Sequence, residues 1–79
     1  MDKTKRLEVN KLIGRACAKW RRGEGISQLK VACDLGMSME NVSAFERGIN
    51  DSVYIFAWYL SKGFDPHESV EVWQAYKSI

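Results

Sequence analysis

The sequence predicts a single all-α domain of five short helices, and three observations lead to this fold class. Apolar side chains recur at helical spacing, as at Ile13, Cys17 and Trp20, and no stretch alternates apolar and polar residues over the length of a strand. Glycines and helix-capping residues divide the chain into short segments. The 79 residues, of which 46% are hydrophobic and 28% charged, suit one small globular domain, residues 1–79.

The first two helices are predicted at residues 7–22 and 28–35. Gly23 ends the first helix, because glycine is common just past a helix end. Ser27 is placed to cap the second helix, since its hydroxyl can accept from a free backbone N–H of the first turn. The residues expected on the apolar face of the second helix are Leu29, Ala32 and Leu35.

The third helix is predicted at residues 39–47, with Ser38 as its N-cap and Gly48 as the left-handed residue that ends it. Only residues 36–38 separate it from the second helix, and this short turn begins with a glycine. Two short helices joined by a three- or four-residue turn containing glycine are typical of a helix-turn-helix.

The fourth and fifth helices are predicted at residues 53–62 and 66–77. Ser52 is placed to cap the fourth helix. Asp65, followed by a proline and then by Glu68, resembles a capping box and predicts the start of the fifth helix.

The turn and its flanking helices carry a family resemblance. The residues involved are Ile13, Gly14, Trp20, Arg21, Gly25, Ile26, Ser27, Gln28, Ala32, Leu35, Gly36, Met37, Ser38, Asn41, Val42, Ser43, Phe45, Glu46, Arg47 and Gly48. Over roughly residues 7–64 the chain resembles the phage-repressor family of helix-turn-helix proteins, which includes the XRE, Cro and lambda-repressor types. The resemblance implies a lambda-repressor-like fold and a small sequence-specific transcriptional regulator of phage or mobile-element origin, often a homodimer, that binds double-stranded DNA.

The resemblance also implies roles for individual residues. Gln28 and Ser38 match positions that contact DNA phosphates, and Arg21 and Glu46 match a buried ion pair between the first and third helices. The residues expected at the DNA surface are Gln28, Lys30, Ser38, Met39, Glu40, Asn41, Ser43, Ala44 and Arg47.

The chemistry of the third helix departs from that of a strong DNA reader. Base edges are read best by Arg, Lys, Asn or Gln, whereas its first exposed residues are Met39 and Glu40. Met39 and Ala44 can touch thymine methyl groups, and Glu40 can accept from cytosine N4. The helix has a net charge of −1, although residues 1–30 hold nine basic and three acidic side chains, a net charge of +6. This asymmetry between the halves indicates either a polyanionic partner for the first half of the chain or simply a solvated, charged first helix.

Two readings of function follow. The first is the DNA-binding regulator, and the alternative is a helix-turn-helix fold reused to bind a host or phage protein.

Residues 1–6, with Lys3, Lys5 and Arg6, are read either as a solvated tail or as a basic arm on the DNA backbone. No nucleophile–base pair or phosphate loop suggests an enzyme, and two cysteines with one histidine suggest neither a metal site nor a cofactor. The absence of a signal-like segment predicts a cytoplasmic protein.

An unusual apolar segment predicts association. Residues 53–60 are apolar on every side of the helix, so more than one surface is expected to cover them. Within the chain, the C-terminal helix, residues 66–79, is expected to pack on this helix through Val70 and Trp73. Between chains, a homodimer or another protein is expected to bind the aromatic residues that favour interfaces, which are Tyr54, Trp58, Trp73 and Tyr76.

Overall fold

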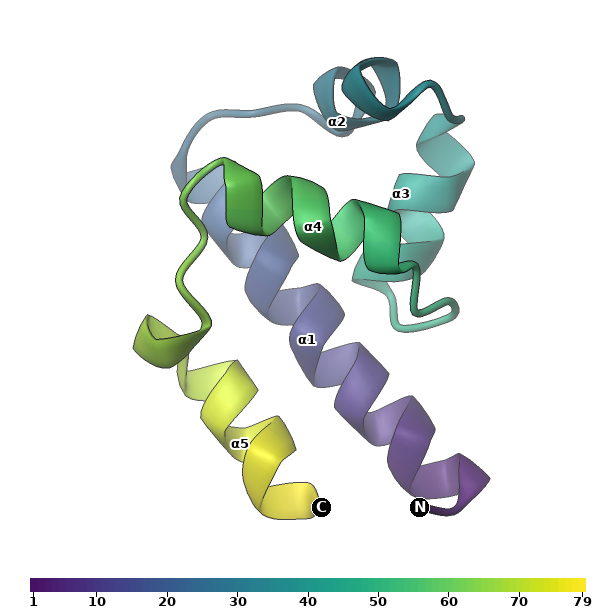
Figure 1. Ribbon diagram of the computed structural model, residues 1–79, viewed down its shortest axis with the longest axis vertical. Coiled ribbons are helices and arrows are strands. Elements are labelled where there is room, and N and C mark those ends of the chain that lie inside the picture. Colours follow the sequence, from purple (N-terminus) through teal and green to yellow (C-terminus); the bar gives the residue numbers. More distant parts are fainter.

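The computed structural model describes all 79 residues and confirms the predicted all-α class, with five α-helices, one short 3₁₀ helix and no strand. In chain order, the elements are α1 (Lys3–Gly23), α2 (Gln28–Leu35), α3 (Met39–Glu46), α4 (Val53–Ser61), η1 (Pro66–Glu68) and α5 (Val70–Ser78) (Figure 1). None of these helices combines the length and the apolar character needed to cross a bilayer.

The longest helix, α1, starts four residues earlier than predicted. Asp2 caps it, because its Oδ1 accepts from the backbone N–H of Lys5 at 2.9 Å. Lys3 and Arg6 therefore belong to the first turns of α1 and are not part of an extended arm. The sequence signal for this start was weak, since residues 3–6 carry no apolar side chain that would mark helical periodicity.

Serine caps set the starts of α2, α3 and α4 as predicted. The hydroxyls of Ser27, Ser38 and Ser52 each accept from the backbone N–H three residues later, at 3.1–3.3 Å. The turn between α2 and α3 depends on Gly36, which adopts a φ of 64° that a side chain would strain. The two helices pack against each other across this turn.

The C-terminal segment differs from the prediction. Asp65 accepts from the backbone N–H of His67, but the chain forms only the 3₁₀ turn η1 there. Ser69 is extended, with φ −96° and ψ 122°, and its hydroxyl caps a separate helix by accepting from the N–H of Val72 at 3.2 Å. Asp65 therefore caps only the 3₁₀ turn, and Ser69 caps the last helix, which starts at Val70 instead of residue 66.

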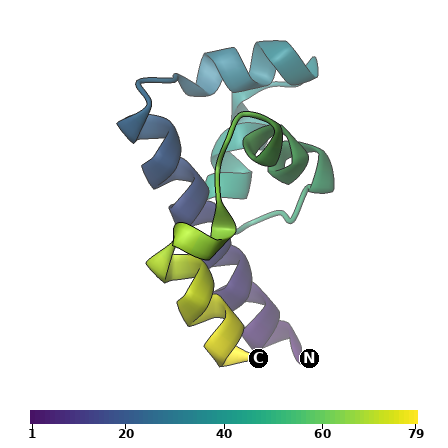
Figure 2. The same ribbon diagram turned by 60° about the vertical axis from the view of Figure 1, so that its left-hand side comes forward.

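The helices are arranged around α1. α3 packs against α1 and α2, and α2 also packs against α4. α5 packs along α1, so that both chain termini lie at the same end of the molecule in both views (Figures 1 and 2). The prediction that the last helix covers α4 is wrong, because α5 packs against α1 and buries Ala75.

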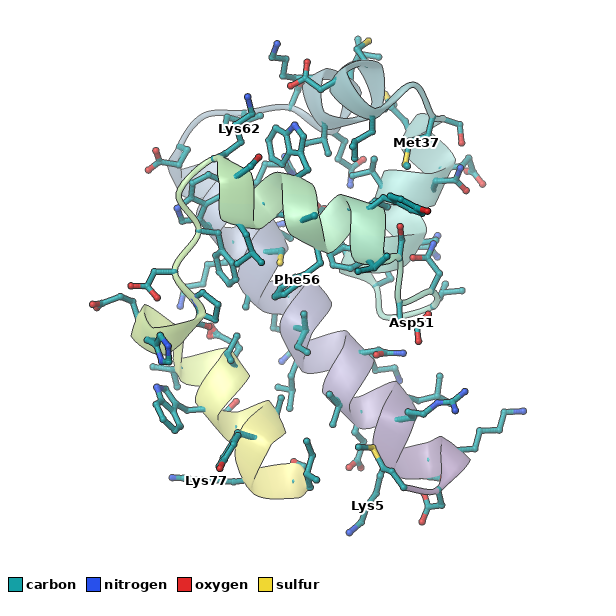
Figure 3. All side chains as sticks on the ribbon, in the orientation of Figure 1. Lys5, Met37, Asp51, Phe56, Lys62 and Lys77 are labelled. Atoms are coloured by element: carbon teal, nitrogen blue, oxygen red, sulfur yellow. The ribbon has the colours of Figure 1, made fainter.

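The core lies between α1, α2, α3 and α4. Its fully buried side chains include Cys17, Val31, Val42, Ile55 and Tyr59. Phe56 is half-buried between α4 and α1 (Figure 3). On α2 the predicted face was partly wrong, since Val31 is fully buried whereas Leu29 is exposed. The register of this short helix is set by its contacts with α3 and α4.

Two glycines bring α1 close to the end of α3. A Cβ added at Gly14 would clash with the carbonyl oxygen of Phe45 and would lie 2.6 Å from that of Glu46. Gly48 has a φ of 79°, and a Cβ there would lie 2.6 Å from backbone atoms of Lys11. Backbone therefore meets backbone at this crossing, which places the C-terminal end of α3 directly beside α1.

Candidate nucleic-acid interface

Beneath the candidate interface, a buried polar cluster centres on the carboxylate of Glu46. Arg21 donates to it through Nε at 2.7 Å and through Nη2 at 3.1 Å, which is the ion pair predicted from the sequence. Gln28 Nε2 donates to Oε1 at 2.9 Å, and the Tyr59 hydroxyl donates to Oε2. The third nitrogen of Arg21 donates to the carbonyl of Ile26 at 2.7 Å. Side chains from α1, α2, α3 and α4 thus meet at one carboxylate.

This cluster controls the ionisation of its members. Burial acts to raise the pKa of Glu46, but the hydrogen bonds from Arg21, Tyr59 and Gln28 outweigh it, so that this pKa lies below its ordinary value. The hydrogen bond to Glu46 raises the pKa of Arg21. Burial, followed by the nearby Glu46 charge, raises the pKa of the Cys17 thiol to about 12. The pair is therefore fully charged at neutral pH, and Cys17 is an unreactive thiol.

A basic groove lies beside this cluster, between α1, the start of α2 and the end of α3. It has a volume of about 540 Å³. The residues that line it are Lys11, Arg15, Ala18, Arg22, Gln28, Ser43, Glu46 and Arg47. Four of these side chains are cationic, and the charge of the one carboxylate is already balanced by Arg21. The groove is thus a cationic surface adjoining the N-terminus of α2, which is itself favourable for anions.

Only some of the residues predicted at the DNA surface line the basic groove. Gln28, Ser43 and Arg47 line it, and the Nε of Arg47 lies 3.3 Å from the Ser43 hydroxyl. The predicted residues outside it are Lys30, Ser38, Met39, Glu40, Asn41 and Ala44, of which all but the half-buried Ala44 are exposed. Lys30 is engaged with Asp34 at 3.0 Å, one helical turn away.

Three cations of the groove were missed by sequence reasoning. Lys11, Arg15 and Arg22 come from α1 and share one face, since they are spaced by four and then by seven residues. That spacing was visible in the sequence. It does not stand out there, because basic residues occur along the whole of the first helix and the groove forms only where α1 meets α2 and α3.

The structure separates the four aromatic residues predicted at an interface. Trp58 is only 6% exposed, and its indole N–H donates to Asp34 Oδ2 at 3.0 Å, which holds the pKa of that carboxyl below its usual range with help from Lys30. The prediction of an exposed Trp58 is therefore wrong. Tyr54 is exposed on α4, whereas Trp73 and Tyr76 are exposed on α5 and pack edge to face at 5.7 Å.

The remaining reactive residues form no cluster. Cys33 is exposed on α2, Cys17 is buried, and no three His, Cys, Asp or Glu side chains come together in a way that would hold a metal ion. The basic groove and the adjoining α3 surface together form the candidate interface. Comparison of this chain with protein-family models, with curated proteins and with solved structures gave no match.

Proposed function

We propose that the protein binds double-stranded DNA as a small lambda-repressor-like helix-turn-helix regulator, with α2 and α3 as the motif. The observation that carries the proposal is the basic groove. Its four cationic side chains come from two helices and lie next to the N-terminus of α2. Neutralising phosphates and releasing their counterions supplies much of the affinity of proteins for DNA.

In this proposal α1 takes part in binding the DNA backbone. Arg15 and Arg22 reach phosphates from α1, while Arg47 reaches them from the residue after α3. Gln28 uses one amide hydrogen on Glu46, which orients the side chain and leaves its second hydrogen for a phosphate. The charge that α3 lacks is thus supplied by its neighbours.

The exposed surface of α3 is the proposed base reader. Asn41 is exposed there and has the amide that suits an adenine edge. Met39 and Glu40 precede it, so thymine methyl groups and cytosine N4 are the groups that they would contact. With a single amide among these three side chains, the preference for particular bases is expected to be modest.

The proposal is tested by measuring the affinity of the full chain for a mixed-sequence duplex over a salt series, by fluorescence anisotropy. A groove variant, Arg22→Gln, is expected to weaken binding to every duplex and to reduce the slope of log K against log salt by about one. The matched control is Lys77→Gln, which removes the same charge from the far end of α5 (Figure 3).

Three outcomes would contradict DNA binding through the groove. They are a failure of the wild type to bind at low salt, an effect of Lys77→Gln equal to that of Arg22→Gln, and a flat salt dependence. Base reading by α3 has a separate test, because Asn41→Ala should alter the ranking of different duplexes and not merely lower all affinities together. If the ranking of the duplexes is unchanged, α3 does not read bases through Asn41, and binding to the DNA backbone is the only part of the proposal that stands.

A second candidate function is supported by the start of α3. Met39 is exposed and Glu40 is acidic, and an apolar side chain beside a carboxylate suits a protein surface better than a phosphate-lined groove. In this alternative the fold binds another protein through α3. Loss of DNA binding in the salt series together with an intact fold would favour it.

A further inference from the structure

A second groove lies on another side of α1, between its C-terminal half and residues 63–71. It has a volume of about 480 Å³, within the range of roughly 300–1,000 Å³ typical of ligand sites. Two aromatic side chains, Trp20 and Phe64, and four carboxylates, those of Glu24, Asp65, Glu68 and Glu71, are among the residues that line it. The residues of α1 that face it are different from those that line the basic groove.

The floor of this groove is aromatic. Trp20 is half-buried and packs edge to face on the buried Phe64, with ring centroids 6.2 Å apart. The indole N–H groups of Trp58 and Trp73 both donate to protein acceptors, whereas that of Trp20 has none within hydrogen-bonding distance. Trp20 thus contributes an aromatic ring to the lining of the groove.

The rim of the groove is acidic. Four carboxylates line it, those of Glu24, Asp65, Glu68 and Glu71, against one cation, Lys19. The Nζ of Lys19 lies 3.5 Å from Glu71 Oε1, so this pair is already formed. The Asp65 carboxylate caps η1, and the side chains of Glu24 and Glu68 make no hydrogen bond or ion pair within the chain. The groove as a whole is negatively charged.

We propose that this acidic groove binds an arginine-bearing, apolar segment of a partner protein. A phosphate backbone is repelled by the rim, and a bare metal ion would gain nothing from an apolar floor. A guanidinium fits both parts, because it stacks on an indole ring and donates to carboxylates through a planar fork. Apolar side chains next to the arginine would cover Val70, which is exposed at the edge of the groove.

This site is independent of the proposed DNA contact. α3 and η1 lie on different sides of α1 (Figure 1), and the two grooves share no lining residue. A DNA duplex in the basic groove therefore leaves the acidic groove open to a protein. The acidic groove adds a second partner class to the one proposed above.

The probe for this site is an acetylated and amidated pentapeptide of alternating leucine and arginine, added to the ¹⁵N-labelled full chain. The readout is the indole N–H signal of Trp20 in a heteronuclear NMR spectrum, with the signals of Trp58 and Trp73 as internal references. The peptide is expected to shift the Trp20 signal saturably. The same peptide with neutral citrulline in place of arginine, or the variant Glu24→Gln/Glu68→Gln, should weaken binding about fivefold.

The matched control is Glu8→Gln/Asp51→Asn, which removes two exposed carboxylates outside the groove. It should leave the affinity for the arginine peptide unchanged. The proposal is overturned if the Trp20 signal does not move, if the citrulline peptide binds as well as the arginine peptide, or if the control variant loses as much affinity as the groove variant. The last outcome would mean that the overall charge of the protein attracts the peptide.

Discussion

At the scale of single residues, Glu46 is the group on which the domain depends most. Its two oxygens accept four hydrogen bonds from Arg21, Gln28 and Tyr59, which lie on three other helices. A buried ion pair contributes little when intact, but removal of one partner leaves the other charge without compensation. The cluster therefore holds α3 in place against α1, α2 and α4, and so fixes the position of the end of α3 that lines the basic groove.

The first prediction concerns this carboxylate. Glu46→Ala should lower the free energy of unfolding by about 3–5 kcal/mol, because it leaves the Arg21 guanidinium buried without its partner. Urea unfolding at neutral pH measures this loss. A midpoint equal to that of the wild type would contradict the role assigned to the cluster.

The second prediction concerns pH. Because the pKa of Glu46 is lower in the folded state than its usual value of 4.5, its stabilisation is complete above that value and is lost as the pH falls through the folded pKa. Glu46→Gln should therefore be less stable than the wild type at neutral pH, and the difference should shrink on acidification. Thermal melts from neutral to acidic pH measure it, and a difference independent of pH would contradict the prediction.

Sequence reasoning found only part of this cluster. Arg21 and Glu46 were predicted as a pair because they match paired positions in the family that the chain resembles. Tyr59 could not be added, since it lies in the apolar run of α4 and its hydroxyl has no sequence pattern that marks a partner. Gln28 was predicted to contact phosphate, and its hydrogen bond to Glu46 depends on how α2 crosses α3.

At the scale of elements, the caps were predictable and the packing was less so. Ser27, Ser38 and Ser52 cap their helices locally, so their role follows from a few neighbouring residues. The partner of α5 did not follow from the sequence, because α1 and α4 both present apolar surfaces. A choice between them depends on the path of residues 62–69, which includes a 3₁₀ turn that was not foreseen.

The third prediction concerns the crossing of α1 and α3. Gly14→Ala would place a methyl group against two backbone carbonyl oxygens, which cannot move aside as a flexible side chain can. The expected loss of stability is about 1–3 kcal/mol, even though alanine favours a helix by about 1 kcal/mol over glycine. The control is Gly23→Ala at the end of the same helix, where an added Cβ has no neighbour within 4 Å.

The two glycine variants are compared by thermal unfolding. Gly23→Ala should melt at or slightly above the wild-type temperature, and Gly14→Ala well below it. Equal melting temperatures for both variants would show that α1 and α3 can separate without cost. In that case the basic groove between them would not be a fixed feature of the fold.

At the scale of the whole molecule, charge and aromatic surface are divided among different faces. The basic groove faces one side of α1 and the acidic groove another, and three of the nine basic residues of the segment 1–30 line the basic groove. Val70 and Glu71, at the start of α5, line the acidic groove. The exposed apolar side chains farther along the chain, Trp73, Tyr76 and Ile79, line neither groove and form the C-terminal patch.

The last prediction is that the C-terminal patch joins two copies of the chain. Trp73 is 47% exposed and Tyr76 70% exposed, and aromatic side chains of this kind dominate many interfaces. A two-fold contact uses the same patch on both copies and would present two α3 helices to one duplex. Tyr76→Glu should therefore shift the mass seen by light scattering from dimer to monomer and weaken binding to a palindromic duplex.

The control for this variant is Gln74→Glu, which adds the same charge at another exposed position of α5. A wild type that is monomeric at tens of micromolar, or a Gln74→Glu variant that dissociates equally, would contradict a dimer through this patch.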